Sequence, residues 1–230
     1  MHLLIYGADG VTGGRLVGQA LARGHKVRAS VRSLDGSERG HDQLQWVTSD
    51  ILAAEQLDRD MEGIDAVLNA VGIDAGPVTA VAPPPLHSQG TRNILSAMRA
   101  TGVDRLITIS ATFVETLERG PIAFRAAASV GLRAIFDDMA LMEKILAQQS
   151  DLRWTAIRPG WLLDEDPTED YGVFADVIPQ DLIRTRTGDL AHFMLRCAEE
   201  DLHIRETPAI ARAEPEEKSD MQAVLKEMAG

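Results

Sequence analysis

Among its 230 residues the chain has a single cysteine, Cys197. One cysteine excludes an internal disulfide framework and a cysteine-rich zinc site, and we expect no metal centre. Long apolar runs are also missing, since none reaches the roughly 18 residues that a membrane-spanning helix needs. The first residues lack the basic and apolar regions of a signal peptide. We therefore expect a cytoplasmic protein that does not associate with a membrane.

Basic side chains are scarce as well, with 23 Lys and Arg against 35 Asp and Glu and a formal net charge of −12. A field of this sign repels nucleic acid, so we expect no nucleic-acid partner. The 45% hydrophobic and 25% charged residues are typical of a folded globular chain. The length fits one domain over residues 1–230.

Tyrosine occurs only twice, as Tyr6 and Tyr171. Four residues beyond them lie Gly10 and Ala175, so neither forms a Tyr-x-x-x-Lys pair. Ordinary carbonyl reduction by short-chain dehydrogenases needs such a pair to protonate the alkoxide that is formed. The sequence therefore argues against a standard alcohol dehydrogenase.

Short apolar runs alternate with amphipathic stretches along most of the chain, which is typical of successive βαβ units. The pattern predicts strands over residues 3–6, 25–31, 44–47, 65–71, 105–110 and 154–158, and helices over 11–23, 53–61, 87–100, 135–149, 187–197 and 219–228. We expect an α/β fold, a single Rossmann-type doubly wound parallel sheet with helices on both faces. Residues 111–132 and 161–180 are predicted to be loops that line a cleft, and 214–230 an acidic C-terminal segment.

A glycine-rich turn lies where the first strand meets the first helix, with Gly7, Gly10 and Gly13 spaced as GxxGxxG. Glycine at these points allows a tight turn, a close approach of backbone to a pyrophosphate and close helix packing. The helix N-terminus adds free N–H groups and partial positive charge. We predict a dinucleotide site that also includes Asp9, Val11 and Thr12.

The end of the second strand is where an acidic residue selects NAD and an arginine admits NADP. Here the sequence has Arg32 and Ser33, and the first carboxylate is Asp35. A guanidinium binds a phosphate through charge-assisted hydrogen bonds, so NADP(H) is favoured. A surface arginine with no ligand, with Asp35 taking its place, is the alternative. Further cofactor contacts are expected from Asp50, Ile51, Ala70, Val71 and Gly72.

Ser110 ends the fifth strand at the sheet edge where open α/β sheets bind ligands. We expect it beside the nicotinamide, either as a catalytic or as a structural residue. Pro159 and Gly160 end the sixth strand and are predicted to contact the cofactor. Trp161 follows and could stack a flat acceptor or only fill the rim of the core.

These residues resemble the atypical short-chain dehydrogenase/reductases, an NmrA-like NAD(P)H-binding group, and within it the flavin reductases related to biliverdin reductase B. The resemblance covers most of the chain and rests on residues 7–13, 31–32, 90–94, 102–105, 110–111, 137–138, 142–146 and 188–197. It implies NADPH bound in a shallow cleft, Arg32 on the 2′-phosphate, Ser110 beside the nicotinamide, and a monomer. Asp74 and the Pro159-Gly160-Trp161 run depart from that group's arginine and histidine, which disfavours a tetrapyrrole acceptor.

The predicted function is an NADPH-dependent reductase that transfers hydride to a small planar conjugated acceptor, FMN, FAD or a quinone. Such acceptors can take their proton from water, so the missing tyrosine–lysine pair is no obstacle. One alternative is an NmrA-like redox sensor that binds NADP(H) without turnover. Another is a sugar-nucleotide epimerase or dehydratase, which the missing tyrosine and the short chain oppose.

Overall fold

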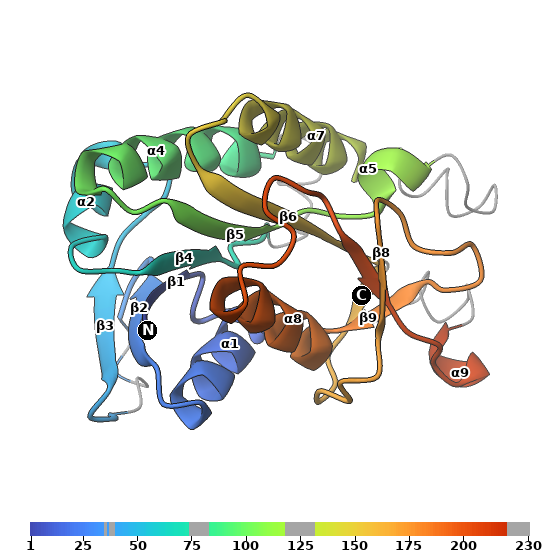
Figure 1. Ribbon diagram of the computed structural model, residues 1–230. Coiled ribbons are helices and arrows are strands. Elements are labelled where there is room, and N and C mark those ends of the chain that lie inside the picture. The colour runs from blue at the N-terminus through green and yellow to red at the C-terminus, as the bar shows by residue number, and fades with distance from the viewer. Residues whose placement is uncertain (35, 37–39, 74–82, 118–131, 220–230) are drawn as a thin grey trace.

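A sheet of eight strands runs through the centre of the computed structural model, which describes residues 1–34, 36, 40–73, 83–117 and 132–219 (Figure 1). The strand order is β3-β2-β1-β4-β5-β6-β10-β8. The strands are β1 (His2–Tyr6), β2 (Lys26–Val31), β3 (Leu44–Thr48), β4 (Ala66–Asn69), β5 (Arg105–Ile109), β6 (Arg153–Pro159), β8 (Gly172–Phe174) and β10 (Ala209–Ala211). All neighbouring pairs are parallel except β10 with β8.

Helices cover both faces of this sheet, as predicted. The longer ones are α1 (Val11–Ala22), α4 (Leu86–Thr101), α7 (Arg133–Ala147) and α8 (Thr187–Glu199). In Figure 1 α1 and α8 lie below the sheet, and α4 and α7 lie above it with the short α2 (Leu57–Asp60). The architecture is therefore a doubly wound α/β fold, and strand order 3-2-1-4-5-6 is that of Rossmann folds.

Strand β1 shows why the sequence folds this way. Leu3, Leu4, Ile5 and Tyr6 are all buried, which is expected of a central parallel strand with helices on both sides. Because side chains alternate along a strand, Leu3 and Ile5 pack in the cluster with α1 and α8, while Leu4 and Tyr6 pack in the cluster with α4 and α7. The strand order reverses at β1, since β2 and β3 lie on one side of it and β4, β5 and β6 on the other. The connections from these strands therefore leave the sheet in opposite directions, which leaves a crevice at the carboxyl ends of β1 and β4.

Several elements differ from the prediction. The helix expected over 53–61 is a 3-10 turn, η1 (Ala54–Gln56), followed by the single-turn α2, because Leu57 and Met61 are its only buried apolar side chains. The described part of the predicted loops contains α5 (Phe113–Thr116) and two strands. These are β7 (Trp161–Leu163), which pairs in parallel with β9 (Arg184–Arg186), and β8, which pairs with β10. Residues 118–131 of the first loop lie outside the described residues. The C-terminal segment has α9 (Glu216–Ser219), and residues 220–228 of the helix expected over 219–228 lie outside the described range.

Candidate functional site

The turn from β1 to α1 is built so closely that two of its glycines cannot be replaced without movement. Gly7 has φ +72°, and a Cβ there would lie 2.9 Å from the backbone nitrogen of Val71. A Cβ on Gly13 would lie 1.9 Å from the Gly7 carbonyl oxygen. Gly10 precedes α1 in extended conformation and provides no side-chain cap. The first N–H groups of α1 are therefore left for a ligand, as an anion site requires.

A cavity of about 320 Å³ lies beside this turn, at the carboxyl ends of β1, β2 and β4. Many of the predicted cofactor residues line it: Gly7, Asp9, Gly10, Arg32, Asp50, Ile51, Ala70, Val71 and Gly72. Ser33 is exposed and is not among the lining residues, and Gly13 packs beneath Gly7 instead of facing the cavity. The cavity thus brings together the glycine turn and the end of β2.

Polar groups at the far end of this cavity would meet an adenosine. Arg32 is exposed at the cavity wall, and within the described residues its guanidinium has no ion pair or hydrogen bond. Asp35, the alternative at this corner, lies outside the described residues. The hydroxyls of Ser30 and Ser49 form a hydrogen bond of 2.5 Å between β2 and the end of β3. Asp50 accepts from the backbone N–H of Leu52 at 2.9 Å, so it fixes the local turn as well.

A second cavity, of about 600 Å³, meets the first, since Gly10, Ala70, Val71 and Gly72 line both. The predicted Val11, Thr12, Ser110, Pro159, Gly160 and Trp161 all line the second cavity. Its walls are mainly apolar, with Ile109, Phe113, Ile135, Phe136, Met139 and Leu162 contributed by the four elements β5, α5, α7 and β7. The ring of Phe113 packs against those of Phe136 and Trp161 at centroid distances of 5.5 and 6.2 Å. Such a wall suits a flat apolar molecule.

Ser110 is held by a buried ion pair that the sequence did not reveal. Its Oγ donates to Oε1 of Glu143 on α7 at 2.6 Å. Arg158 on β6 donates to both oxygens of that carboxylate, from Nε at 2.9 Å and from Nη2 at 2.6 Å. Burial alone would lower the pKa of Arg158, but the hydrogen bonds and charge of Glu143 raise it, with Glu115 adding to the effect. The guanidinium is therefore a fixed positive charge behind Ser110.

His87 at the start of α4 also lines the second cavity. Its backbone N–H donates to Asp138 of α7 at 2.8 Å, so a side chain from another helix caps α4. The ring is buried, and among the described residues its Nε2 has no hydrogen-bond partner. Burial lowers the pKa of His87, although the charge of Asp138 opposes this. The imidazole is thus neutral near pH 7.

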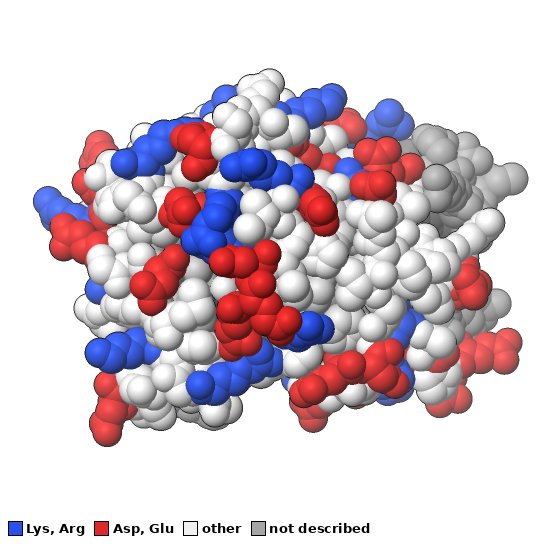
Figure 2. Space-filling model, in the orientation of Figure 1, with Lys and Arg blue, Asp and Glu red and all other residues white. Residues whose placement is uncertain are grey.

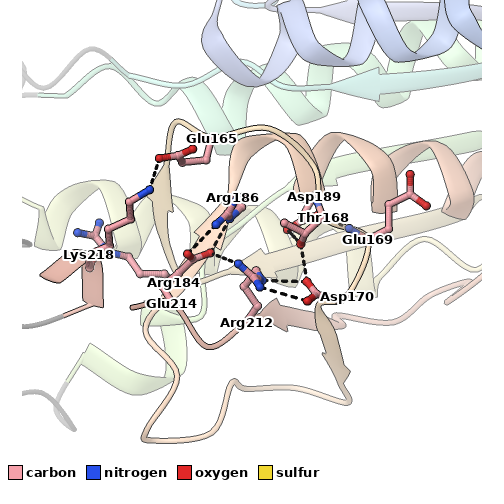
Figure 3. Close-up of polar contacts among 10 residues, drawn as sticks. All are labelled: Glu165, Thr168, Glu169, Asp170, Arg184, Arg186, Asp189, Arg212, Glu214 and Lys218. Carbon is pink, nitrogen blue, oxygen red and sulfur yellow. Dashed lines mark hydrogen bonds and ion pairs between the residues drawn. The ribbon is translucent and has the colours of Figure 1, made fainter. Parts of the chain in front are cut away.

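A network of charges fixes the wall that carries Trp161 (Figure 3). Arg186 and Arg212 both point at Glu214, with Arg186 Nε to Oε1 at 2.6 Å and Arg212 Nη1 to Oε1 at 2.7 Å. The hydrogen bonds from Arg186 are the main reason that the pKa of Glu214 is lowered. Asp189 at the start of α8 accepts from the backbone N–H of Thr168 at 2.6 Å. The segment after β7, the start of α8 and the segment after β10 are therefore held together.

Two further ion pairs join this wall to α1. Arg15 of α1 lies 2.9 Å from Asp164, which lines the second cavity, and 2.7 Å from Asp166. These contacts connect the segment after β7 to the first turns of α1. Both carboxylates are exposed, so each pair adds little stability.

Sequence reasoning missed the groups that support the predicted residues. Glu143 and Arg158 were the detectable ones, because each is a charged residue next to buried apolar residues. Glu143 follows Met142 on the buried side of α7, and Arg158 follows Ile157 in β6. A charge in such a position is usually paired when it is buried. His87 gave no signal of this kind.

The turn, the two joined cavities and the strand order define a Rossmann-type nucleotide-binding protein. The chain belongs to the NAD(P)H-binding family, whose sequence model matches residues 7–201. The expected membership of an NAD(P)H-binding group is thereby confirmed.

Curated relatives span more sequence than this chain. It is 29% identical over 171 residues to an uncharacterised chloroplastic protein of Arabidopsis thaliana, covering 72% of this chain and 61% of the relative. It is 29% identical over 185 residues to a 3-diazoavenalumate denitrifying reductase of Streptomyces, covering 70% of this chain and 56% of the relative. The chain thus spans about 60% of the length of these relatives.

Solved structures support the fold. A candidate NADH-flavin reductase of Streptococcus pneumoniae has a TM-score of 0.73 at 23% identity, covering 93% of this chain and 100% of the other. A short-chain dehydrogenase/reductase of Veillonella parvula in complex with NADP has a TM-score of 0.73 at 14% identity, covering 92% and 94%. These likenesses confirm the Rossmann architecture.

The surface is mixed in charge. Figure 2 shows Lys and Arg side chains interspersed with Asp and Glu on the face in view, without a broad basic area there. Among the residues that the structure describes, no helix combines the length and the hydropathy of a membrane span.

Proposed function

We propose that this chain is an NADPH-dependent reductase whose acceptor is a planar conjugated molecule, a flavin or a quinone. The observation that carries the proposal is the junction of the two cavities. A dinucleotide with its diphosphate at Gly10 and its adenosine toward Arg32 would extend its nicotinamide into the apolar cavity beside Ser110. The acceptor would then stack between the nicotinamide and the Trp161 wall.

The residues present fit such a cofactor. The absence of a Cβ at Gly7 and Gly13 lets the turn pack directly on the backbone of Ala70 and Val71 and on the start of α1, which gives the close turn that a diphosphate site uses. The free N–H groups at the start of α1 favour an anion, and the guanidinium of Arg32 can bind a 2′-phosphate. NADPH supplies the hydride when it is bound.

The protein's part in the reaction is positioning. The α7 side of the second cavity is formed by Ile135, Phe136 and Met139, none of which can exchange a proton. A planar conjugated acceptor spreads the incoming electron pair over its rings and can be protonated by water, so placement within reach of the hydride supplies most of the rate. The apolar rings exclude water from the transfer itself.

The decisive experiment measures NADPH oxidation with and without lumiflavin, FMN and a benzoquinone, together with the binding of NADPH and NADP⁺. We expect acceptor-dependent oxidation with at least one of these compounds. Binding of both redox states with no oxidation across the panel would show a redox sensor instead and would overturn the proposal.

Two substitutions test which residues bind the cofactor and which bind the acceptor. Arg32→Gln should raise the KM for NADPH about tenfold or more and leave that for NADH unchanged, because a charge-assisted phosphate contact is lost. Arg23→Gln, just after α1 and outside the lining of both cavities, is the control. Trp161→Leu should raise the KM for the acceptor, whereas Trp46→Leu on β3 should not.

A further inference from the structure

The hydrogen-bonding role of Ser110 is set by the charges behind it. A guanidinium has donors only, and an ionised carboxylate has acceptors only. Arg158 donates to both oxygens of Glu143, at 2.9 and 2.6 Å, in the two-point geometry of a strong charge-assisted pair. The carboxylate is thereby kept as an acceptor on the side that faces Ser110.

The consequence concerns the hydroxyl hydrogen. Ser110 Oγ lies 2.6 Å from Glu143 Oε1, and the O–H hydrogen must lie on this line because Glu143 has none to give. The oxygen of Ser110 then has only lone pairs to offer to the second cavity, whose wall it forms. A serine with a free hydroxyl could donate or accept, whereas this one can only accept.

We propose that Glu143 and Arg158 are positioning residues that make Ser110 a dedicated hydrogen-bond acceptor for the carboxamide N–H₂ of the nicotinamide. This inference rests on the proposed function. The contact fixes the rotation of the nicotinamide, and hence the ring face that is presented to the acceptor. Ser110 is accordingly not the proton donor of the reaction.

Nucleotide analogues test this by equilibrium binding, without turnover. In the 3-acetylpyridine analogue of NADP⁺ a methyl group replaces the N–H₂ group. The thionicotinamide analogue keeps N–H₂ and changes only the carbonyl oxygen. Wild-type protein should bind the acetylpyridine analogue about fivefold more weakly than NADP⁺, the value of one neutral hydrogen bond, and should bind the thionicotinamide analogue without that loss.

Variants then assign the effect to the residues. Ser110→Ala should bind NADP⁺ and the acetylpyridine analogue equally. Glu143→Met combined with Arg158→Met removes the acceptor of the Ser110 hydroxyl together with the charge behind it, because Oε1 of Glu143 accepts from both Ser110 and Arg158. The freed hydroxyl can donate to the acetyl carbonyl of the analogue or accept from the carboxamide. The fivefold preference should therefore vanish there as well. Glu115→Gln is the matched control, since Glu115 also lies by Arg158, at 3.3 Å, and no contact joins it to Ser110; its preference should stay fivefold.

The outcomes are distinct. A full preference in Ser110→Ala, or in a folded Glu143→Met/Arg158→Met variant, overturns the inference. If that double variant does not fold, Glu143→Leu combined with Arg158→Leu removes the same charges and should show no preference, and retention of the preference in that variant overturns the inference equally. If wild-type protein binds none of the three nucleotides, the proposed function itself fails.

Discussion

Removing one member of the Glu143–Arg158 pair should cost far more stability than removing both. In Glu143→Met the guanidinium of Arg158, whose side chain is 7% exposed, keeps two partners among the described residues. These are the half-exposed Glu115 at 3.3 Å and the carbonyl of Asp176 at 3.1 Å. A buried charge that loses its partner costs about 3–5 kcal/mol. Arg158→Met leaves Glu143 in the same condition and should cost a similar amount.

The double variant is expected to be within about 1–3 kcal/mol of the wild type, because apolar side chains of similar volume replace a buried pair with little net loss, while the buried Ser110 hydroxyl loses its acceptor. The coupling energy would then be several kcal/mol. Urea unfolding of the four proteins at pH 7 gives these values, provided that the m-value does not change. The exposed pair Arg196–Glu200 on α8, at 2.8 Å, is the control and should couple by about 0.3–0.5 kcal/mol.

The reasoning would be refuted if each single variant lost under about 1 kcal/mol and the two effects were additive. That result would mean that water or another group stabilises the lone charge as well as its partner does. Ser110 would then no longer be tied to a fixed carboxylate.

Three further predictions follow from burial and close packing. Gly13→Ala should abolish nucleotide binding in a titration, because its Cβ would lie 1.9 Å from the Gly7 carbonyl oxygen. Gly18→Ala is the control: its Cβ would meet open space, and the substitution should stabilise α1 by up to about 1 kcal/mol. Burial holds the pKa of His87 below its ordinary 6.5, so the unfolded chain binds more protons and stability falls as the pH drops below about 6.5; His87→Gln should flatten this slope in urea unfolding. Burial raises the pKa of the Cys197 thiol to about 12, so iodoacetamide at pH 8 should label it only after unfolding.

The fold was predicted accurately where it depends on residues that are close together in sequence. Such features are the apolar run of β1, the glycine turn and the amphipathic faces of α1, α4, α7 and α8. The structure has these elements within about two residues of the expected bounds. The three-residue strands β7 to β10 were missed because so short a run has no readable alternation. They form only where distant segments supply partners, as Gly172 to Phe174 does for β10.

Residues of the candidate site could be predicted from the sequence where a single segment of the chain forms that part of the site. They could not be predicted where segments far apart in sequence come together. Gly7 to Gly13 and Arg32 follow from position at strand ends. The Ser110–Glu143–Arg158 contact joins β5, α7 and β6, so it depends on strand register and on the rotation of a helix, which the sequence pattern does not express. His87 is similar, because its backbone contact with Asp138 joins α4 to α7, two helices that are far apart in sequence.

Calorimetric titration of the protein with NADPH and, in parallel, with NADH measures whether it binds these nucleotides and whether it prefers the 2′-phosphate. We expect heat with both nucleotides and binding of NADPH at least tenfold tighter, since we propose that the guanidinium of Arg32 binds the 2′-phosphate that NADH lacks. Heat with neither nucleotide would overturn the proposed function, and tighter binding of NADH would overturn the role given to Arg32.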